Sequence, residues 1–459
     1  MDLRSAQKPR GIVYLVHCVD TEGPLYESPS ATREVFSTTY GLKADAVRAI
    51  SRGEVPTELD EALLERWQEH LSRRNFNSDW SDVDRMVSEL MSPAWRQQWL
   101  DDAGQAYVFS WFILDHVGFT SNPRLRTLGY HAVYDRYAEW LMGTNNDRDR
   151  LYWHFHPVSW TKEAHKAACT LASSTEHYQI LSRRLIERMD FPVAFRPGQH
   201  TERPDLNLFL EQWIPFDYGS QGMPERAADA EQLDIGGGRF GDWRRAPEQW
   251  GFYHPSIWDY QVPGSMHRYV ARCLNLDSRL RTITVDEINS AFLSADKGEK
   301  VLMSVTNHDE RDMRPGIAWL MNEINSARHR YPDVSFLYAN AVEGMRAVAG
   351  LAESDPIELQ VTTEPVRGLL TVESSRDAWG GQPFLAARYG ETYIHENLDR
   401  IGANRWSFTF DDMTIPWDAI SAIGLAAHDM EGNTCITRLL RDEEWKPTTV
   451  FRNNGDWLD

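Results

Sequence analysis

Short runs of apolar residues alternate along most of the chain with longer stretches in which apolar positions recur every three or four residues. The longer stretches are typical of amphipathic helices, and their alternation with apolar runs predicts parallel strands joined by helices. The predicted strands are residues 11–19, 106–114, 150–156, 191–195, 213–219, 300–307 and 334–340. The pattern therefore predicts an α/β domain.

Four segments between or after these runs are predicted to be helices. The segment SDVDRMVSELM has Ser81 as its candidate cap, and TVDEINSAF has Thr284. A third helix covers about residues 161–189, and AVEGMRAVAG follows the last run. In the first of them the apolar positions share one helical face: Val83, Met86, Val87, Leu90 and Met91.

The composition changes near residue 350. From Pro356 the chain is rich in Thr, Val, Gly and aromatic residues of alternating polarity, as in IELQVTT, RWSFTFD and CITRLL. Such alternation predicts an antiparallel β-sandwich. We therefore expect an α/β domain at residues 1–352 and a sandwich domain at 353–459, which could serve as a carbohydrate-binding or dimerising module.

Charge and cysteine content exclude several classes of function. The formal net charge of -20, with scattered Lys and Arg, argues against nucleic acid or an anionic membrane as the main partner. No stretch approaches the roughly 20 apolar residues that cross a bilayer, and the N-terminus lacks a secretory signal, so we expect a cytoplasmic protein. The spacing of the cysteines indicates neither a disulfide framework nor a zinc ribbon: Cys18, Cys169, Cys273 and Cys435.

Titratable residues follow six of the seven apolar runs. Side chains that perform chemistry gather at the carboxyl ends of parallel strands, so these groups predict a shared polar site. A single such group would mean little, because a solvated polar residue often ends a strand. The groups, in chain order, are Asp20 with Glu22, Asp115 with His116, His154 with His156, Arg196, Asp217, and His308 with Asp309.

The HFHP segment is the most specific feature. Residues two apart on a strand point the same way, so His154 and His156, about 7 Å apart at the backbone, can reach one metal ion. Two histidines and a carboxylate with one open position are a standard arrangement for activating water, and either Glu22 or Asp20 could be the carboxylate. The alternative is that one histidine only forms a hydrogen bond in a half-buried strand.

The order of DTE, HFHP, FRPG, DW and NHD over residues 11–350 resembles the polysaccharide deacetylases, the NodB-homology proteins of carbohydrate esterase family four. This resemblance implies a distorted (β/α) barrel, here with a long insertion at about residues 25–105. It also implies removal of N- or O-acetyl groups from sugars by metal-activated water, with zinc as the expected metal.

The resemblance assigns roles to the polar residues. Asp20 would be the general base, Arg196 its partner and His308 the general acid. The metal ligands would be Glu22, His154 and His156. The family usually spaces its two ligand histidines four apart, whereas the spacing here is two and Tyr152 occupies the more distant position.

Other residues are candidates for binding substrate. The family's acid and Trp that support the Arg match Asp242 and Trp243, with Asp217 as a competing acid. Asp115 and His116, with Arg126 nearby, could add a further metal ligand or form an anion-binding wall. Tyr253 and Trp258 could stack on a sugar, although packing against the insertion would equally explain these aromatics.

Three functions follow. The first is a metal-dependent carbohydrate deacetylase acting on a glycan or an activated sugar. The second is an amide or imide hydrolase of the same superfamily with a small-molecule substrate. The third is a non-catalytic glycan-binding protein. A homodimer is compatible with all three.

Overall fold

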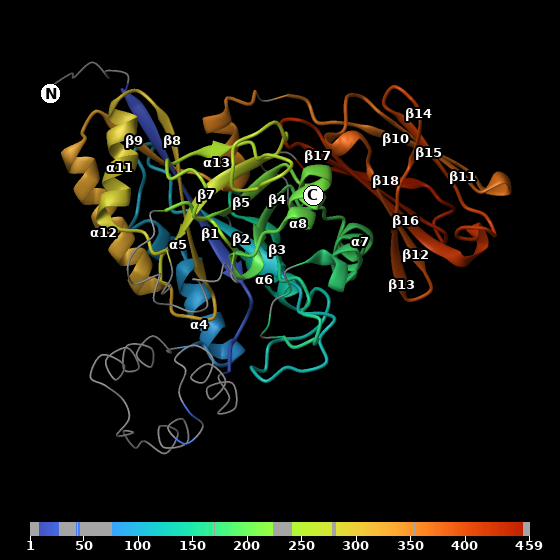
Figure 1. Cartoon of the computed structure of the whole chain (residues 1–459), viewed down its shortest axis with the longest axis horizontal. Coiled ribbons are helices and arrows are strands. Elements are labelled where there is room, and N and C mark those ends of the chain that lie inside the picture. Colours follow the sequence, from blue (N-terminus) through green and yellow to red (C-terminus); the bar gives the residue numbers. More distant parts are fainter. Residues whose placement is uncertain are drawn as a thin grey trace.

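Seven parallel strands close into a barrel in the first part of the chain (Figure 1). The computed structural model describes residues 9–26, 43, 45, 76–144, 146–164, 166, 168, 170–223, 241–277, 281–352 and 354–452. The barrel strands, in spatial order, are β1 (Gly11–Thr21), β2 (Phe109–Leu114), β3 (Arg150–Phe155), β4 (Ala194–Pro197), β5 (Phe216–Ser220), β7 (Tyr269–Asn275) and β8 (Lys300–His308).

The ring closes on β1. Its second half, from His17, pairs with β2, while β8 pairs along nearly its whole length. Beside its first half lies β9 (Val334–Tyr338), and the short β6 (Phe252–Tyr253) pairs antiparallel with β7. The predicted α/β barrel is thereby confirmed as a closed parallel barrel.

Strand β7 is the barrel strand that the apolar pattern did not predict. Arg272 lies in its middle and interrupts the apolar run YVARCLN. The guanidinium points outward, pairs with Glu287 at 2.7 and 2.8 Å, and lies over the Trp250 ring. Because of this paired charge on the outer face, the apolar pattern did not predict the strand, although its inner face is apolar.

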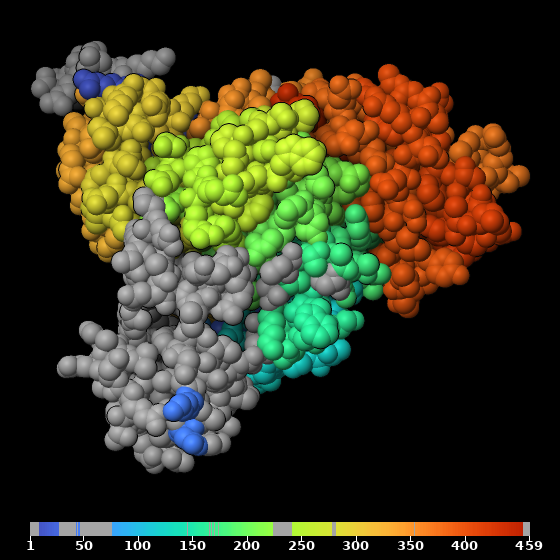
Figure 2. All heavy atoms as spheres, viewed as in Figure 1, coloured from blue at the N-terminus to red at the C-terminus, as the bar shows by residue number. Residues whose placement is uncertain are grey.

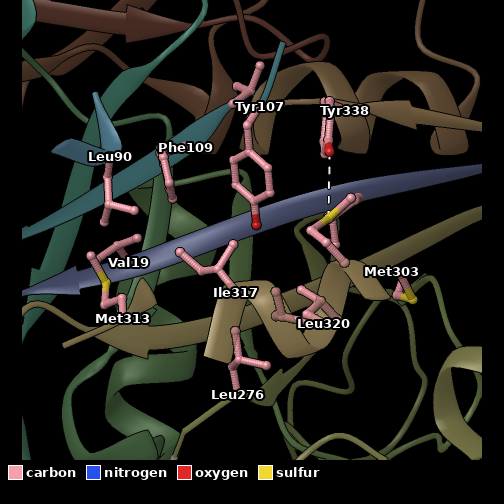
Figure 3. Close-up of a cluster of buried hydrophobic side chains, with 14 of the residues drawn as sticks. Val19, Leu90, Tyr107, Phe109, Leu276, Met303, Met313, Ile317, Leu320 and Tyr338 are labelled. Atoms are coloured by element: carbon pink, nitrogen blue, oxygen red, sulfur yellow. Dashed lines mark hydrogen bonds between the residues drawn. The ribbon is translucent and has the colours of Figure 1, made fainter. Parts of the chain in front are cut away.

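Helices cover the outside of the barrel. They are α4 (Trp80–Leu90), α5 (Pro93–Arg96), α6 (Ala132–Met142), α7 (Glu176–Arg188), α8 (Pro204–Trp213), α11 (Val285–Asp296), α12 (Arg314–Arg330) and α13 (Ala341–Ala349). Figure 3 shows part of the largest core cluster, in which Leu90, Ile317 and Leu320 pack against Val19 and Tyr107. None of the helices in the described part of the chain has the length and apolar character needed to cross a membrane.

Three of the predicted helices can be compared in detail. Thr284 caps α11 as predicted, by accepting a hydrogen bond from the Glu287 N–H. The predicted cap Ser81 is wrong, because Asp79 caps α4 and Ser81 donates to its carboxylate. The predicted helix at 161–189 was too long, since α7 begins only at Glu176.

Two antiparallel sheets follow the barrel. The four-stranded sheet contains β10 (Leu359–Glu364), β11 (Leu369–Ser374), β15 (Arg405–Thr409) and β14 (Asp399–Gly402). The five-stranded sheet contains β13 (Thr392–Glu396), β12 (Phe384–Tyr389), β16 (Ile420–His428), β17 (Thr434–Leu440) and β18 (Pro447–Arg452). The predicted antiparallel region is therefore confirmed.

The five-stranded sheet is buried on both faces. Its residues Leu385 and Leu425 pack toward the four-stranded sheet, whereas Phe384 and Ala426 pack among residues of α7 and α8. Figure 2 shows this red C-terminal part lying directly against the green middle of the chain. Most of the predicted insertion, residues 27–75 apart from 43 and 45, lies outside the described residues, as does Cys169.

Candidate metal centre

Alternation along the strands brings polar side chains to the carboxyl end of the barrel. On β1, Val16 and Cys18 belong to an apolar cluster that holds residues from most of the barrel strands, and the next residues of the same parity are Asp20 and Glu22. Register places Asp20 beside His308 on β8. It also places His154 beside Arg196 on the neighbouring β4. Four predicted site segments thus meet above one apolar cluster.

Glu22, His154 and His156 form a compact, buried group that could hold a metal ion. Glu22 Oε1 lies 3.7 Å from His154 Nε2 and 3.4 Å from His156 Nε2, and the two Nε2 atoms are 3.1 Å apart. A tetrahedral ion with bonds of about 2.1 Å separates its ligand atoms by about 3.4 Å. The three donor atoms therefore fit such an ion, and Glu22 is the carboxylate of the group.

Hydrogen bonding fixes the orientation of His154. Its Nδ1 lies 3.0 Å from the Arg196 carbonyl oxygen, which can only accept, so Nδ1 carries the proton and Nε2 faces Glu22 and His156. Burial lowers the pKa of both histidines; Asp20 and Glu22 reverse this effect for His154, whose pKa is raised, but the pKa of His156 stays lowered.

A glycine makes room for His156. An added Cβ on Gly198, in the FRPG segment, would lie 2.0 Å from His156 Cδ2 and 2.6 Å from the Phe155 carbonyl oxygen. Real Cβ atoms do not approach this closely, so only glycine allows the imidazole its position. The FRPG segment thus shapes the site through Gly198 as well as through Arg196.

Asp20 and Arg196 form a buried ion pair beside the three ligands. Arg196 Nε is 2.6 Å from Asp20 Oδ1 and Nη2 is 3.2 Å from Oδ2, while Nη1 donates to the Tyr218 carbonyl. Burial raises the pKa of Asp20, but Arg196, His154 and His308 outweigh it, and the pKa is well below its usual range. Asp20 is therefore held ionised.

His308 is more exposed than the buried groups beside it. Its Nε2 lies 3.6 Å from Asp20 Oδ2, and its side chain is 22% exposed, compared with 1% for Asp20. The imidazole can therefore reach a bound molecule while it remains close to the buried carboxylate.

Arg126 and Asp309 support Glu22, a role that the sequence did not indicate. Arg126 Nη2 lies 2.7 Å from Glu22 Oε2 and 2.6 Å from Glu310 Oε2. Asp309 accepts hydrogen bonds from the Glu22 and Gly23 N–H groups, and burial raises the pKa of its carboxyl to about 7. These contacts join segments more than 100 residues apart, so no local pattern reveals them.

Asp115 and His116 face different surroundings. Asp115 binds the buried Arg184 and the His131 N–H, and so anchors α7 and the segment before α6. His116 faces the site: burial, followed by the charge of Arg126, lowers its pKa to about 3, and Glu22 also acts on it. Its Nδ1 has no hydrogen-bond partner in the described structure.

The predicted acid and Trp do not support Arg196, whose side-chain partners are Asp20 and Tyr218. Asp242 instead pairs with Arg244, and the competing Asp217 pairs with Arg268. Trp243 is fully buried, and its Nε1 donates to the His200 carbonyl. The fourth motif is thus corrected: Trp243 holds the loop that follows β4, and neither acid contacts Arg196.

Only one of the two aromatic residues predicted to stack on a sugar is exposed. Tyr253 is buried and its hydroxyl donates to the Tyr260 carbonyl, whereas Trp258 is 86% exposed.

His200, the last residue of FRPGQH, was missed although it lies in a segment that the sequence singled out. Burial, followed by the charge of Arg196, lowers its pKa well below the ordinary value, and Asp20 and His308 also act on it.

The known proteins give no independent indication of function. No family model matches the chain, and no curated protein matches it in sequence. The function is therefore inferred from the geometry of the site.

Proposed function

We propose that this protein is a metal-dependent hydrolase that removes an N- or O-acetyl group from a glycan or an activated sugar. The observation that carries the proposal is the buried triangle of Glu22, His154 and His156 beside the ion pair of Asp20 and Arg196. This combination places a candidate metal site, an ionised carboxylate and the accessible imidazole of His308 at one end of the barrel.

The donor set suits zinc, one carboxylate and two imidazoles being a common catalytic combination. When bound, such an ion supplies Lewis-acid activation of water and of the acetyl carbonyl. The proposal includes zinc as the metal and a barrel of the deacetylase type. It also includes a cytoplasmic location, a carbohydrate partner and a homodimer.

Asp20 and His308 take opposite roles with protons. Asp20 accepts a proton from the attacking water, because Arg196 keeps the carboxylate ionised and fixes the direction of its oxygen atoms. His308 donates a proton to the leaving amine or alkoxide as the bond to the acetyl carbon breaks. The products are acetate and the free amine or alcohol, and the proton taken by Asp20 balances the one given by His308.

A second function is also compatible with the site, because only one of the predicted sugar-stacking residues is exposed. Trp243 and Tyr253 are packed in a small buried cluster and offer no surface for a long sugar chain. Such a site would also suit a small amide or cyclic imide, so this hydrolase activity is the alternative. The third hypothesis, a glycan-binding protein without metal, requires that the triangle hold no ion.

Elemental analysis of protein purified without an affinity tag separates these functions. We expect one divalent ion per chain in the wild type, and its loss in Glu22→Ala and His156→Ala. His267→Ala, at a side chain that is 71% exposed, is the matched control and should keep the ion. Protein that stays metal-free after reconstitution with zinc would refute the hydrolase proposal.

A screen for acetate release from N- and O-acetylated sugars should follow, with ring opening of cyclic imides measured in parallel. Acetate release that depends on His308 supports the deacetylase. Ring opening without acetate release would instead favour the small-molecule hydrolase.

A further inference from the structure

Two buried side chains beside the candidate metal centre each keep a polar atom without a hydrogen-bond partner. Among the residues that the structure describes, these atoms are Nδ1 of His116 and Nη1 of Arg126. His116 is 2% exposed, and the side chain of Arg126 is 8% exposed. Buried polar atoms in folded proteins are normally paired, so two such atoms beside one site indicate that a bound molecule pairs with them.

Strand geometry turns His116 toward the metal centre. Phe112 on β2 points into the barrel, and His116 has the same parity in the extended segment that follows, where it pairs with Gly129. The charges of Glu22 and of both candidate ligand histidines act on its imidazole. His116 nevertheless lies outside the compact group that could hold the ion. It is therefore a neighbour of the metal centre and not one of its ligands.

Arg126 is held beside this imidazole. After burial, its charge has the largest effect on the pKa of His116, which places the two side chains close together. The backbone N–H of Arg126 donates to Asn122 Oδ1 at 2.9 Å, and its carbonyl accepts from Asn122 Nδ2 at 2.8 Å. Its Nη2 is engaged by Glu22 and Glu310. Because the guanidinium is fixed in this way, Nη1 can donate to a ligand at little cost in conformational entropy.

The charges around Arg126 favour an uncharged ligand. Burial raises the pKa of Glu22 and Glu310, but Arg126 acts against it and both pKa values are lowered, so both carboxylates are ionised. His116 is neutral, because burial lowers its pKa to about 3. One cation beside two anions has no excess positive charge for an anion to neutralise. A neutral oxygen atom, in contrast, can accept hydrogen bonds from Nη1 and from the imidazole.

We propose that His116 and Arg126 form a subsite that binds an uncharged oxygen atom of the substrate, beside the acyl group. Arg126 donates through Nη1 and His116 through Nδ1. The oxygen belongs to a hydroxyl group if the substrate is an acetylated sugar, and to the second carbonyl if it is a cyclic imide. This inference rests on the proposed function, because it gives the hydrolysed molecule a second polar contact next to the metal.

Ligand-observed NMR titration of the zinc-free protein tests this subsite without turnover, with N-acetylglucosamine and succinimide as probes. We expect binding at least about fivefold weaker in His116→Phe and His116→Leu, because one hydrogen bond is lost. His116→Asn should bind like the wild type, since its amide nitrogen can take the place of Nδ1. His267→Phe, at a histidine side chain that is 71% exposed, is the matched control.

Four results would overturn the proposal. The first is a wild type that binds neither probe, and the second is equal probe affinity in the wild type, His116→Phe and His116→Leu. The third is a His116→Asn variant that binds the probes no better than His116→Phe. The fourth is loss of zinc affinity in His116→Phe, measured by chelator competition, because His116 would then be a ligand.

The same titrations identify the oxygen atom. Binding of N-acetylglucosamine that depends on His116 would assign it to a hydroxyl group, and binding of succinimide that depends on His116 would assign it to a carbonyl. Tighter binding of succinamate, the ring-opened carboxylate, than of succinimide would overturn the assignment to an uncharged oxygen.

The subsite and the hydrolase can fail separately. Wild-type protein that stays metal-free would refute the hydrolase. Wild-type protein that binds zinc, but whose probe affinity is the same in the His116 variants, would refute the subsite alone.

Discussion

Gly198→Ala tests whether the short His-x-His spacing forms a metal site. The added methyl group would lie 2.0 Å from His156 Cδ2, whereas carbon atoms in ordinary contact are about 3.5–4.0 Å apart. The imidazole, or the loop that carries Gly198, must therefore move by more than about 1 Å. Metal–ligand distances tolerate deviations of only about 0.2 Å, so the ring cannot move this far and remain a ligand.

We expect zinc affinity to fall by at least about 100-fold in Gly198→Ala, because one of the three ligands is displaced. Overpacking of this kind also costs about 1–3 kcal/mol of folding free energy. Competition with a chromophoric chelator measures the affinity, and urea unfolding of the metal-free protein measures the stability.

Gly143→Ala is the matched control, since its Cβ would meet only carbonyl oxygens at 3.5 Å and its backbone is helical. This variant should bind zinc like the wild type. Equal zinc affinity in Gly198→Ala and Gly143→Ala would refute the assignment of His156 as a ligand, provided that both variants fold.

Three other predictions concern Arg126, Arg196 and His428. Arg126→Gln should weaken zinc binding about 10–100-fold, measured by the same chelator competition, because Glu22 loses the cation that orients it; Arg244→Gln, at a surface pair, should not. Arg196→Gln should destabilise the protein by about 3–5 kcal/mol in urea unfolding, because Asp20 is left charged and buried without its partner. The control Arg188→Gln breaks a half-exposed ion pair and should lower the free energy of unfolding by less than about 1 kcal/mol. His428 is buried between Thr434 and the Pro192 carbonyl, and burial lowers its pKa from 6.5 to about 3, so the unfolded chain takes up the proton first as pH falls. Between about pH 6.5 and 3 this histidine should therefore remove about 1.4 kcal/mol of stability per pH unit, and His428→Asn should unfold with a correspondingly smaller pH slope.

The sequence predicted where the polar residues lie along the chain, but not which of them face inward. On β2 the interior residue Phe112 has the parity of His116, so Asp115 points outward to Arg184. On β5, Phe216 and Tyr218 point inward, so Asp217 points outward and pairs with Arg268. Strands of a parallel barrel are apolar on both faces, so the pattern does not show which parity is interior.

Other features depend on long-range contacts. The β1 acids and HFHP could be proposed as a site from their types and spacing alone. Arg126 contacts Glu22 and Glu310 only in the closed barrel. The same is true of the hydrogen bond that Asp309 accepts from the loop after β1. Likewise, Gly198 reveals its role only when β4 lies beside β3.

The charges at the carboxyl end of the barrel explain why its first apolar strand ends in acids. Asp20, Glu22 and Glu310 face Arg196 and Arg126, which leaves one excess negative charge among these buried groups when all are ionised. At the same place the Nε2 atoms of His154 and His156 lie 3.1 Å apart, and two lone pairs at this distance repel unless a cation lies between them. A proton on one nitrogen can satisfy the pair of histidines but leaves Glu22 Oε1 without a short contact to either ring. A divalent ion contacts all three atoms at once, which is why we expect the folded chain to select a metal there.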